Sequence, residues 1–280
     1  MKKYNIREPK DNEITGSIKV LYSSFGRDLP EKIKEEEKIW KTLIDEEIGR
    51  FVISEKDGKF IGVGGIFLFE KVCSFGYMAV LPEYRGKGLG TEIFSRLLEI
   101  ANKMNCETKV LYASKLGEPI YKKFGFKRRF YGVMYQLPLQ TSELGIVDKE
   151  VKILNTTPDW ILSLDKKAMG FDRVRYLNMR IKLGARILMV ENEGYGLLAN
   201  NRLGPLISTN LKAASQIINK SITLDADHMI IAHHQYFPKR IFNFFNFVEL
   251  ENRASVKMVL GKEIPENLDL LYAIGTYAKG

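Results

Sequence analysis

A glycine-rich turn between two apolar runs constrains the fold of this chain more than any other feature. The run Val72–Val80 predicts a strand, and the apolar residues of Thr91–Met104 recur at helical spacing. Between them lies PEYRGKGLG, residues 82–90. Glycines let consecutive backbone N–H groups converge, and a helix start adds unpaired N–H groups with a partial positive charge. The stretch therefore predicts an anion-binding turn, to which Arg85 and Lys87 add whole charges, with a diphosphate as its natural ligand.

Two common phosphate-binding loops do not fit this turn. A Walker A loop needs Gly-x-x-x-x-Gly-Lys followed by Ser or Thr, and the chain has no such sequence. The dinucleotide fingerprint Gly-x-Gly-x-x-Gly fails because its last position, counted from Gly86, is Thr91. The pattern that remains is Arg85-x-x-Gly88-x-Gly90.

Hydrophobic periodicity predicts a mixed α/β arrangement in residues 1–138, with a hairpin whose turn carries Asp57-Gly58. We expect strands at residues 4–7, 50–54, 60–69, 72–80, 108–113 and 126–137, and helices at 14–25, 30–47, 91–104 and 119–124. Residues 139–150 are polar and rich in turn-forming side chains, which is typical of a linker.

The order of elements starts again after this linker. We expect strands at residues 151–154, 187–191, 196–200, 229–233 and 256–260, and helices at 158–168, 211–219 and 238–245. The restart indicates an internal duplication with a period of about 140 residues. The sequence therefore predicts an α/β (α+β) fold of two tandem domains, residues 1–138 and 151–280, each with a mixed central sheet flanked by helices.

The turn and its flanks resemble those of the GCN5-related N-acetyltransferase (GNAT) family. Arg85-x-x-Gly88-x-Gly90 matches the family signature Q/R-x-x-G-x-G/A, and Met78–Tyr84 looks like the strand and loop that precede it. The resemblance implies that the turn holds the pyrophosphate of acetyl-coenzyme A (acetyl-CoA), and that free amides at Met78 and Val80 hold its pantetheine and polarise the thioester. The cofactor-binding residues implied are Met78, Ala79, Val80, Arg85, Gly86, Lys87, Gly88, Leu89, Gly90, Thr91 and Ser114.

A second stretch, residues 113–126, resembles the later family motif in which a tyrosine precedes a Gly-Phe pair. Tyr121 occupies the position of that tyrosine, which implies a catalytic acid that protonates the departing thiolate. Ser114 stands where many members carry an asparagine, so it keeps a hydrogen-bonding side chain but a shorter one. The basic residues 122–129 meet either the 3′-phosphate of the cofactor or only solvent.

The general base is not assigned, because Lys109 stands where relatives that act on protein N-termini often carry a glutamate. Glu70 and Glu83 are nearby carboxylates, but we expect both to face solvent. The acidic residues 35–37 and 45–47 border the acceptor groove by resemblance, and we interpret them as a solvated helix face with i,i+4 lysine partners.

The second half resembles the C-terminal partner domain of some acetyltransferases and lacks the chemistry of the first half. The stretch Asn201–Leu206 has no spaced glycines, and Phe242 stands where Tyr121 would. Asp172 and Arg173 either border the acceptor site or form a structural ion pair. Histidines 228, 233 and 234 fit no common zinc spacing, so we expect no metal. We infer a degenerate GNAT-like domain.

Composition limits the partners. The net charge is +9 but the cations are dispersed, which argues against nucleic acid as a partner. We expect no membrane span and no signal peptide, and buried thiols at Cys73 and Cys106 in a cytoplasmic protein. A homodimer is left open.

The favoured function is N-acetyltransfer from acetyl-CoA to a primary amine, by direct attack in a ternary complex. The acceptor is a small molecule or a peptide, and its identity is open. The alternative is a non-catalytic sensor module that binds acyl-coenzyme A.

Overall fold

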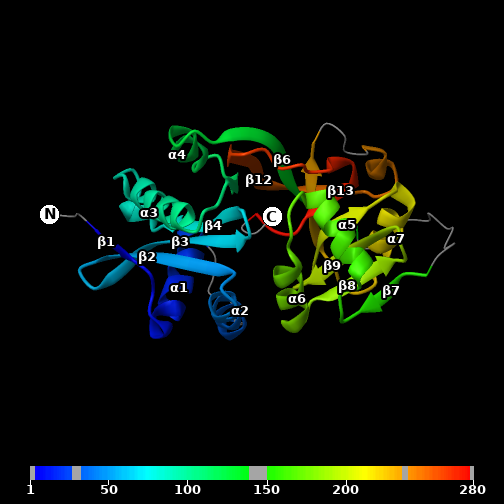
Figure 1. Cartoon of the computed structure of the whole chain (residues 1–280), viewed down its shortest axis with the longest axis horizontal. Coiled ribbons are helices and arrows are strands. Elements are labelled where there is room, and N and C mark those ends of the chain that lie inside the picture. Colours follow the sequence, from blue (N-terminus) through cyan, green and yellow to red (C-terminus); the bar gives the residue numbers. More distant parts are fainter. Residues whose placement is uncertain (1–3, 27–32, 139–149, 235–238, 278–280) are drawn as a thin grey trace.

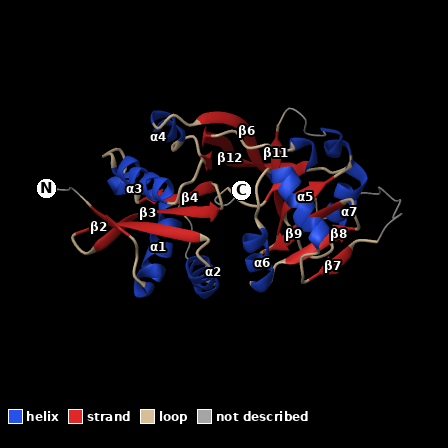
Figure 2. Cartoon of the chain, in the orientation of Figure 1, coloured by secondary structure: helices blue, strands red, loops and turns tan. Residues whose placement is uncertain are grey.

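The computed structural model describes residues 4–26, 33–138, 150–234 and 239–277 (Figure 1). Its described strands form one mixed sheet of 13 strands, in the order β1-β2-β3-β4-β5-β12-β6-β11-β13-β10-β9-β8-β7. Helices cover both faces of the sheet, as Figure 2 shows. The predicted α/β fold class is confirmed.

The elements of the first half follow the predicted order. The strands are β1 (Asn5–Arg7), β2 (Gly49–Lys56), β3 (Lys59–Phe69), β4 (Val72–Val80), β5 (Thr108–Ala113) and β6 (Lys127–Gln136). The helices are α1 (Ile14–Ser24), α2 (Ile33–Asp45), α3 (Leu89–Lys103) and α4 (Glu118–Lys123), with short 3-10 turns η1 (Asp11–Glu13) and η2 (Pro82–Tyr84).

The second half repeats this order with departures. Its strands are β7 (Lys152–Leu154), β8 (Arg186–Val190), β9 (Gly194–Ala199), β10 (Arg202–Ser208), β11 (His228–His233), β12 (Val248–Gly261) and β13 (Leu271–Ile274). Its helices are α5 (Asp159–Met169), α6 (Val174–Lys182) and α7 (Leu211–Ile222), with 3-10 turns η3 (Lys239–Asn243) and η4 (Leu268–Leu270). Three of these, α6, β10 and β13, are absent from the sequence prediction, and the helix expected at 238–245 is the 3-10 turn η3.

The two halves exchange strands. Val256 of β12 pairs with Ala113 of β5, while His228 of β11 pairs with Gln136 of β6. Strands β6 and β12 also pair with each other, and they lie side by side between the halves in Figure 1. Each half therefore completes its part of the sheet with a strand from the other half. The domain boundaries stay a prediction, and residues 139–149 of the expected linker lie outside the described part of the chain.

Aromatic side chains on the two faces of the first half mark which helix covers which face. On one face Phe94 of α3 meets Phe75 of β4 edge to face, with ring centroids 5.0 Å apart. On the other, Trp40 of α2 stacks on Phe51 of β2 at 4.0 Å. Burial of such rings is the main source of packing energy in a sheet covered by helices. Strand β4 therefore runs between two packed layers.

Candidate active site

Strand β4 separates from its neighbour β5 halfway along its length. The two strands pair in parallel from Val72 with Thr108 to Phe75 with Leu111, and no further pair between them follows in the described residues. On the other edge of β4, the register with β3 shifts just after Gly76. The backbone at Tyr77 has a φ of +55°, which is uncommon for a residue with a side chain. Strand β4 thus has a bulge at the point of separation.

The amides beyond this bulge face the side from which β5 has separated. The N–H of Leu81 donates to Ile61 O of β3 at 3.0 Å. Alternate amides of a strand point to opposite edges, so the N–H group of Val80 points away from β3, whereas Met78 lies within the bulge itself. The Val80 amide is in position to donate to a ligand that enters between the strands.

The turn after β4 presents a row of backbone amides. Gly86 and Gly88 have φ values of +72° and +87°, and Gly88 caps α3. Within the described part of the chain, the structure gives no hydrogen-bond acceptor for the amides of Gly86, Lys87 and Gly88. The next two amides, of Leu89 and Gly90, open a helix and have no acceptor one turn earlier. Five consecutive amides can therefore bind an anion at this helix start.

The two cations of the turn are held by backbone carbonyls. Arg85 donates from Nε to Val80 O at 2.9 Å and from its terminal nitrogen to Ser24 O of α1. Lys87 Nζ donates to Glu83 O at 2.8 Å and lies over the Tyr84 ring. The arginine therefore fixes the turn against α1 and β4, and the amides, more than the side chains, form the anion-binding surface.

Tyr121 lies in α4 and is 6% exposed. Its ring meets Phe94 of α3 edge to face at 4.8 Å, so the tyrosine belongs to the α3 face of the sheet. Burial raises the pKa of the Tyr121 phenol, which therefore keeps its proton at neutral pH. A protonated phenol can act as an acid.

Ser114 begins the turn that leads into α4. Its Oγ accepts a hydrogen bond of 3.2 Å from the amide of Gly117, and its carbonyl accepts from the amide of Glu118 at 2.9 Å. The side chain is exposed. In this structure its hydroxyl stabilises the start of α4.

The two carboxylates considered for the base, Glu70 and Glu83, are both exposed, and Lys109 stands where the family glutamate would. Lys109 is buried, and its Nζ donates to Cys106 O at 2.7 Å. Glu83 is exposed and pairs with Lys59 at 3.4 Å. Glu70 is exposed at the tip of the turn between β3 and β4. The exposure of Glu70 and Glu83 agrees with the expectation that both carboxylates face solvent.

The sequence did not predict a group of polar contacts near the place where the two halves meet. Tyr77 donates from its hydroxyl to Glu36 Oε1 of α2 at 3.3 Å. From the second half, Arg180 of α6 donates to Tyr176 Oη at 3.0 Å. Burial raises the pKa of Tyr77, the Glu36 charge raises it further, and the charges of Arg180 and Arg202 oppose this.

The acidic residues of α2 are therefore more than a solvated helix face with lysine partners. Trp40 Nε1 donates to Glu36 at 3.2 Å, and this carboxylate also receives the Tyr77 hydroxyl. Glu46 pairs with Lys182 of α6 at 3.0 Å. The Trp40 contact is an i,i+4 pair within α2, but no local pattern reveals the other two, because Tyr77 and Lys182 lie in distant parts of the chain.

The corresponding separation in the second half is filled. Strands β10 and β11 pair in parallel only at Leu203 with Met229 and at the preceding pair. Beyond that point β13 enters between them, and Ala273 pairs with Leu206 on one side and with Ile231 on the other. A chain segment thus occupies the place that a cofactor would need. Strand β10 pairs in parallel with β11 as β4 does with β5, so β10 is the counterpart of β4. The counterpart of the glycine turn is therefore residues 209–210, which join β10 to α7, and not Asn201–Leu206.

The remaining second-half candidates have structural partners. Arg173 forms a buried ion pair of 2.6 Å with Asp165, whereas Asp172 accepts at 2.8 Å from the amide of Val174, the first residue of α6. Phe242 lies in η3 against Tyr135. Among the described residues, no group of three or more His, Cys, Asp and Glu could hold a metal.

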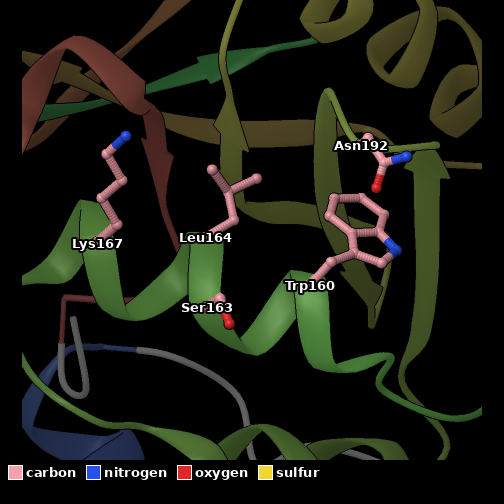
Figure 3. Close-up of a pocket in the computed structure, with 5 residues that line it drawn as sticks. All are labelled: Trp160, Ser163, Leu164, Lys167 and Asn192. Carbon is pink, nitrogen blue, oxygen red and sulfur yellow. The ribbon is translucent and has the colours of Figure 1, made fainter.

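The basic cluster after Tyr121 and one surface hollow carry no assigned chemistry. Glu118 binds both Lys122, at 2.9 Å, and Arg128. The hollow, of about 260 Å³, lies along α5 (Figure 3). Of its five described lining residues, Trp160, Ser163, Leu164, Lys167 and Asn192, only the lysine ionises. Within the described residues, every helix is too short or too polar to traverse a membrane.

Comparison with known families agrees with this geometry. Residues 18–126 match the acetyltransferase (GNAT) family, and residues 161–273 match an acetyltransferase (GNAT) domain. The chain therefore belongs to the GNAT acetyltransferase family, with one family domain in each half. The resemblance predicted from Arg85, Gly88 and Gly90 is confirmed.

Individual relatives cover the chain to different extents. The uncharacterized N-acetyltransferase YitH of Bacillus subtilis is 28% identical over 183 residues, 61% of this chain and 64% of that protein. A proposed ribosomal protein bS18 alanine N-acetyltransferase of the same species is 27% identical over 96 residues, 32% of this chain and 62% of that protein. This chain thus spans less than two thirds of the length of either curated relative.

Solved structures show the same two-domain architecture. A proposed acetyltransferase from Pyrococcus horikoshii superposes with a TM-score of 0.91 at 31% identity, covering 100% of this chain and 97% of that one. A GCN5-related N-acetyltransferase from Sphaerobacter thermophilus superposes with a TM-score of 0.64 at 14% identity, covering 95% of this chain and 99% of that one. The second likeness concerns the fold alone.

Proposed function

We propose that this protein transfers the acetyl group of acetyl-CoA to a primary amine, by direct attack in a ternary complex. The observation that carries the proposal is the row of five unpaired amides from Gly86 to Gly90, placed where β4 and β5 have separated. A pyrophosphate is the anion that such a row fits, because successive N–H groups and the helix start all favour negative charge. Family membership supports this assignment.

Three groups of residues would hold the cofactor. Residues 85–91 would bind its pyrophosphate through main-chain amides. The amides of Met78 and Val80, with Ala79 between them, would hold the pantetheine arm and the thioester oxygen. Ser114 lies at the start of α4 and would border the same channel. When bound, acetyl-CoA supplies the activated acyl group as a thioester.

The chain's own groups supply two catalytic contributions. The amides of Met78 and Val80 would stabilise negative charge that develops on the thioester oxygen, which is often the largest single contribution in acyl transfer. Tyr121 would donate its proton to the sulfur that departs, and its raised pKa means that the phenol carries that proton at neutral pH. Direct attack is favoured because Cys73 and Cys106 are both buried, and Cys73 lies where β4 still pairs with β5, before the bulge.

Only the first half would bind the cofactor. In the second half β13 occupies the separation between β10 and β11, and Phe242 in place of a tyrosine has no proton to donate. We accordingly propose residues 1–138 as the catalytic unit and residues 151–280 as a degenerate GNAT-like unit. Strand β12 ties the second unit to the sheet of the first.

Two measurements test the proposal. Titration calorimetry with acetyl-CoA should show one site per chain, and release of the coenzyme A thiol should follow addition of a suitable amine. Binding with no turnover on any amine of a broad panel would favour the acyl-coenzyme A sensor. Absence of binding would remove both functions.

A further inference from the structure

A second hollow, of about 380 Å³, lies beside the first residues of β6, and its volume is in the range of small-molecule sites. Strand β11 ends at His233, whose partner on β6 is Tyr131, whereas β6 reaches back to Lys127. The stretch before Tyr131 therefore has no β11 partner in the described residues, although its other edge pairs with β12. We call the space beside it the β6 hollow. Its described lining residues come from β6, from the end of β11 and from the segment after β12: Arg128, Arg129, Phe130, His233, His234, Glu263, Ile264, Glu266 and Leu268.

Two opposite charges from different walls of the β6 hollow meet in an exposed ion pair. Arg129 of β6 donates from a terminal guanidinium nitrogen to Glu263 Oε1, in the segment after β12, at 2.7 Å. The two side chains are 43% and 77% exposed. An exposed pair of this kind contributes little to stability, so a ligand that replaces both of its charges can open it at low cost.

The other ionisable groups of the β6 hollow already have ionic partners or carry no charge. Arg128 binds both carboxylate oxygens of Glu118 in α4, one of them at 2.7 Å. Glu266 accepts a hydrogen bond from Lys257 of β12, and this pair is buried. Burial lowers the pKa of both lining histidines, so their rings are neutral at pH 7. Among the described lining residues, the exposed pair therefore supplies the cation and the anion that a ligand can take most easily.

The remaining described lining residues are apolar. Phe130 is 6% exposed, and Lys257 Nζ lies 5.2 Å from the centroid of its ring. Ile264 and Leu268 are half-buried on the opposite side of the chain connection from β12 to η4. An apolar ligand group placed against these side chains would leave water, which favours binding.

We propose that the β6 hollow binds an α-amino acid with an apolar side chain. The carboxylate binds the planar guanidinium fork of Arg129, the ammonium binds Glu263, and the side chain lies against Phe130, Ile264 and Leu268. A zwitterion matches this lining because it replaces both members of the ion pair at once and leaves neither charge without a partner. The described lining residues include none of those proposed for acetyl-CoA. This binding therefore goes beyond the proposed acetyl transfer and does not depend on it.

Titration calorimetry without acetyl-CoA tests the ligand class. L-leucine, L-methionine and L-phenylalanine present the zwitterion with different apolar side chains, and we expect at least one of them to bind. The amide of that amino acid lacks the carboxylate, and its deaminated acid lacks the ammonium. Each should bind about 10- to 100-fold more weakly, because each loses hydrogen bonds to a charged group. Absence of binding by all of the amino acids at millimolar concentration, or equal binding of the amide, would overturn the proposal and leave the proposed acetyl transfer intact.

Variants of the ion pair assign each ligand group to its residue. Arg129→Met should weaken binding of the amino acid about 10- to 100-fold but hardly change binding of its amide, which has no carboxylate to lose. Glu263→Gln should weaken the amino acid similarly and hardly change the deaminated acid. Both side chains are exposed, so we expect both variants to fold. Arg96→Met, which removes an arginine from the exposed pair with Glu99 on α3, is the matched control. Equal amino-acid affinities of Arg129→Met and Arg96→Met would contradict the site.

Discussion

The hydroxyl of Tyr77 donates a hydrogen bond of 3.3 Å to Glu36 Oε1, which joins the bulge of β4 to helix α2. The contact brings a carboxylate to the strand whose amides are proposed to hold the acyl group. Glu46, which directly follows α2, pairs with Lys182 of α6 at 3.0 Å, so the two halves of the chain meet beside this helix.

Glu36→Gln should weaken use of the amine acceptor. The amide keeps an oxygen that can accept from Trp40 and Tyr77 but removes the negative charge, so we expect KM for the amine to rise about tenfold with an unchanged Kd for acetyl-CoA. Steady-state kinetics and calorimetry measure the two quantities. Glu35→Gln, on an exposed position of the same helix, serves as the control. Kinetics identical to the wild type would remove Glu36 from the site.

Tyr121→Phe should lower kcat by about 100-fold, because the variant loses the proton donor but keeps the ring that packs on Phe94. Acetyl-CoA affinity and the free energy of unfolding should stay within error of the wild type. The control is Tyr112→Phe, which removes a buried hydroxyl that has no partner in the described residues. A kcat for Tyr121→Phe equal to that of Tyr112→Phe would contradict the proposed acid.

Gly88→Ala separates cofactor binding from backbone strain. An added Cβ at Gly88 meets no atom within 4 Å, so the cost is conformational, about 1 kcal/mol for a residue at a φ of +87°. Gly58, in the turn between β2 and β3, has a φ of +75° and the same open space. Gly58→Ala should therefore lose similar stability in urea unfolding. Only Gly88→Ala should weaken acetyl-CoA binding, and equal affinities would argue against the amide row as the phosphate site.

Stability in acid should depend on Glu118. Hydrogen bonds first from Arg128 and then from Lys122 lower the pKa of Glu118 from 4.5 to about 2 in the folded protein. A carboxylate with a lowered pKa contributes stability above its unfolded pKa and loses it as the pH falls toward the folded value. The free energy of unfolding should therefore fall between about pH 4.5 and pH 2, and fall less in Glu118→Gln.

A second carboxylate with the same behaviour provides an internal reference for this titration. A hydrogen bond from Arg7 lowers the pKa of Glu13 to about 2, and this contribution is present in the wild type and in Glu118→Gln alike. The difference between the two proteins thus isolates Glu118. Parallel curves of unfolding free energy against pH, from urea titrations at each pH, would contradict its ion pairs with Arg128 and Lys122.

Local sequence predicted the elements that local forces determine. The ends of Val72–Val80 and Thr108–Ala113 agree with the structure, because both are apolar runs bounded by turn signals and buried in the sheet. Strand β10 was missed because Gly204-Pro205 is a strong turn signal, yet the strand continues past it with a shift in register toward β9. Here pairing with neighbouring strands outweighs the local preference.

Long-range relationships could not be predicted from the sequence. The exchange of β6 and β12 depends on pairing between strands far apart in the chain, and nothing in either strand specifies its partner. For the same reason the contact between Glu46 and Lys182 could not be predicted. The phosphate-binding turn was predictable because its glycines, its strand and its helix are contiguous in sequence.

A crystal structure with bound acetyl-CoA tests the central claim most directly. The account predicts the pyrophosphate on the amides of residues 86–90, the thioester at the β4 bulge between Met78 and Val80, and the sulfur facing the Tyr121 hydroxyl. Coenzyme A bound in the second half, or bound outside the separation of β4 and β5, would contradict it.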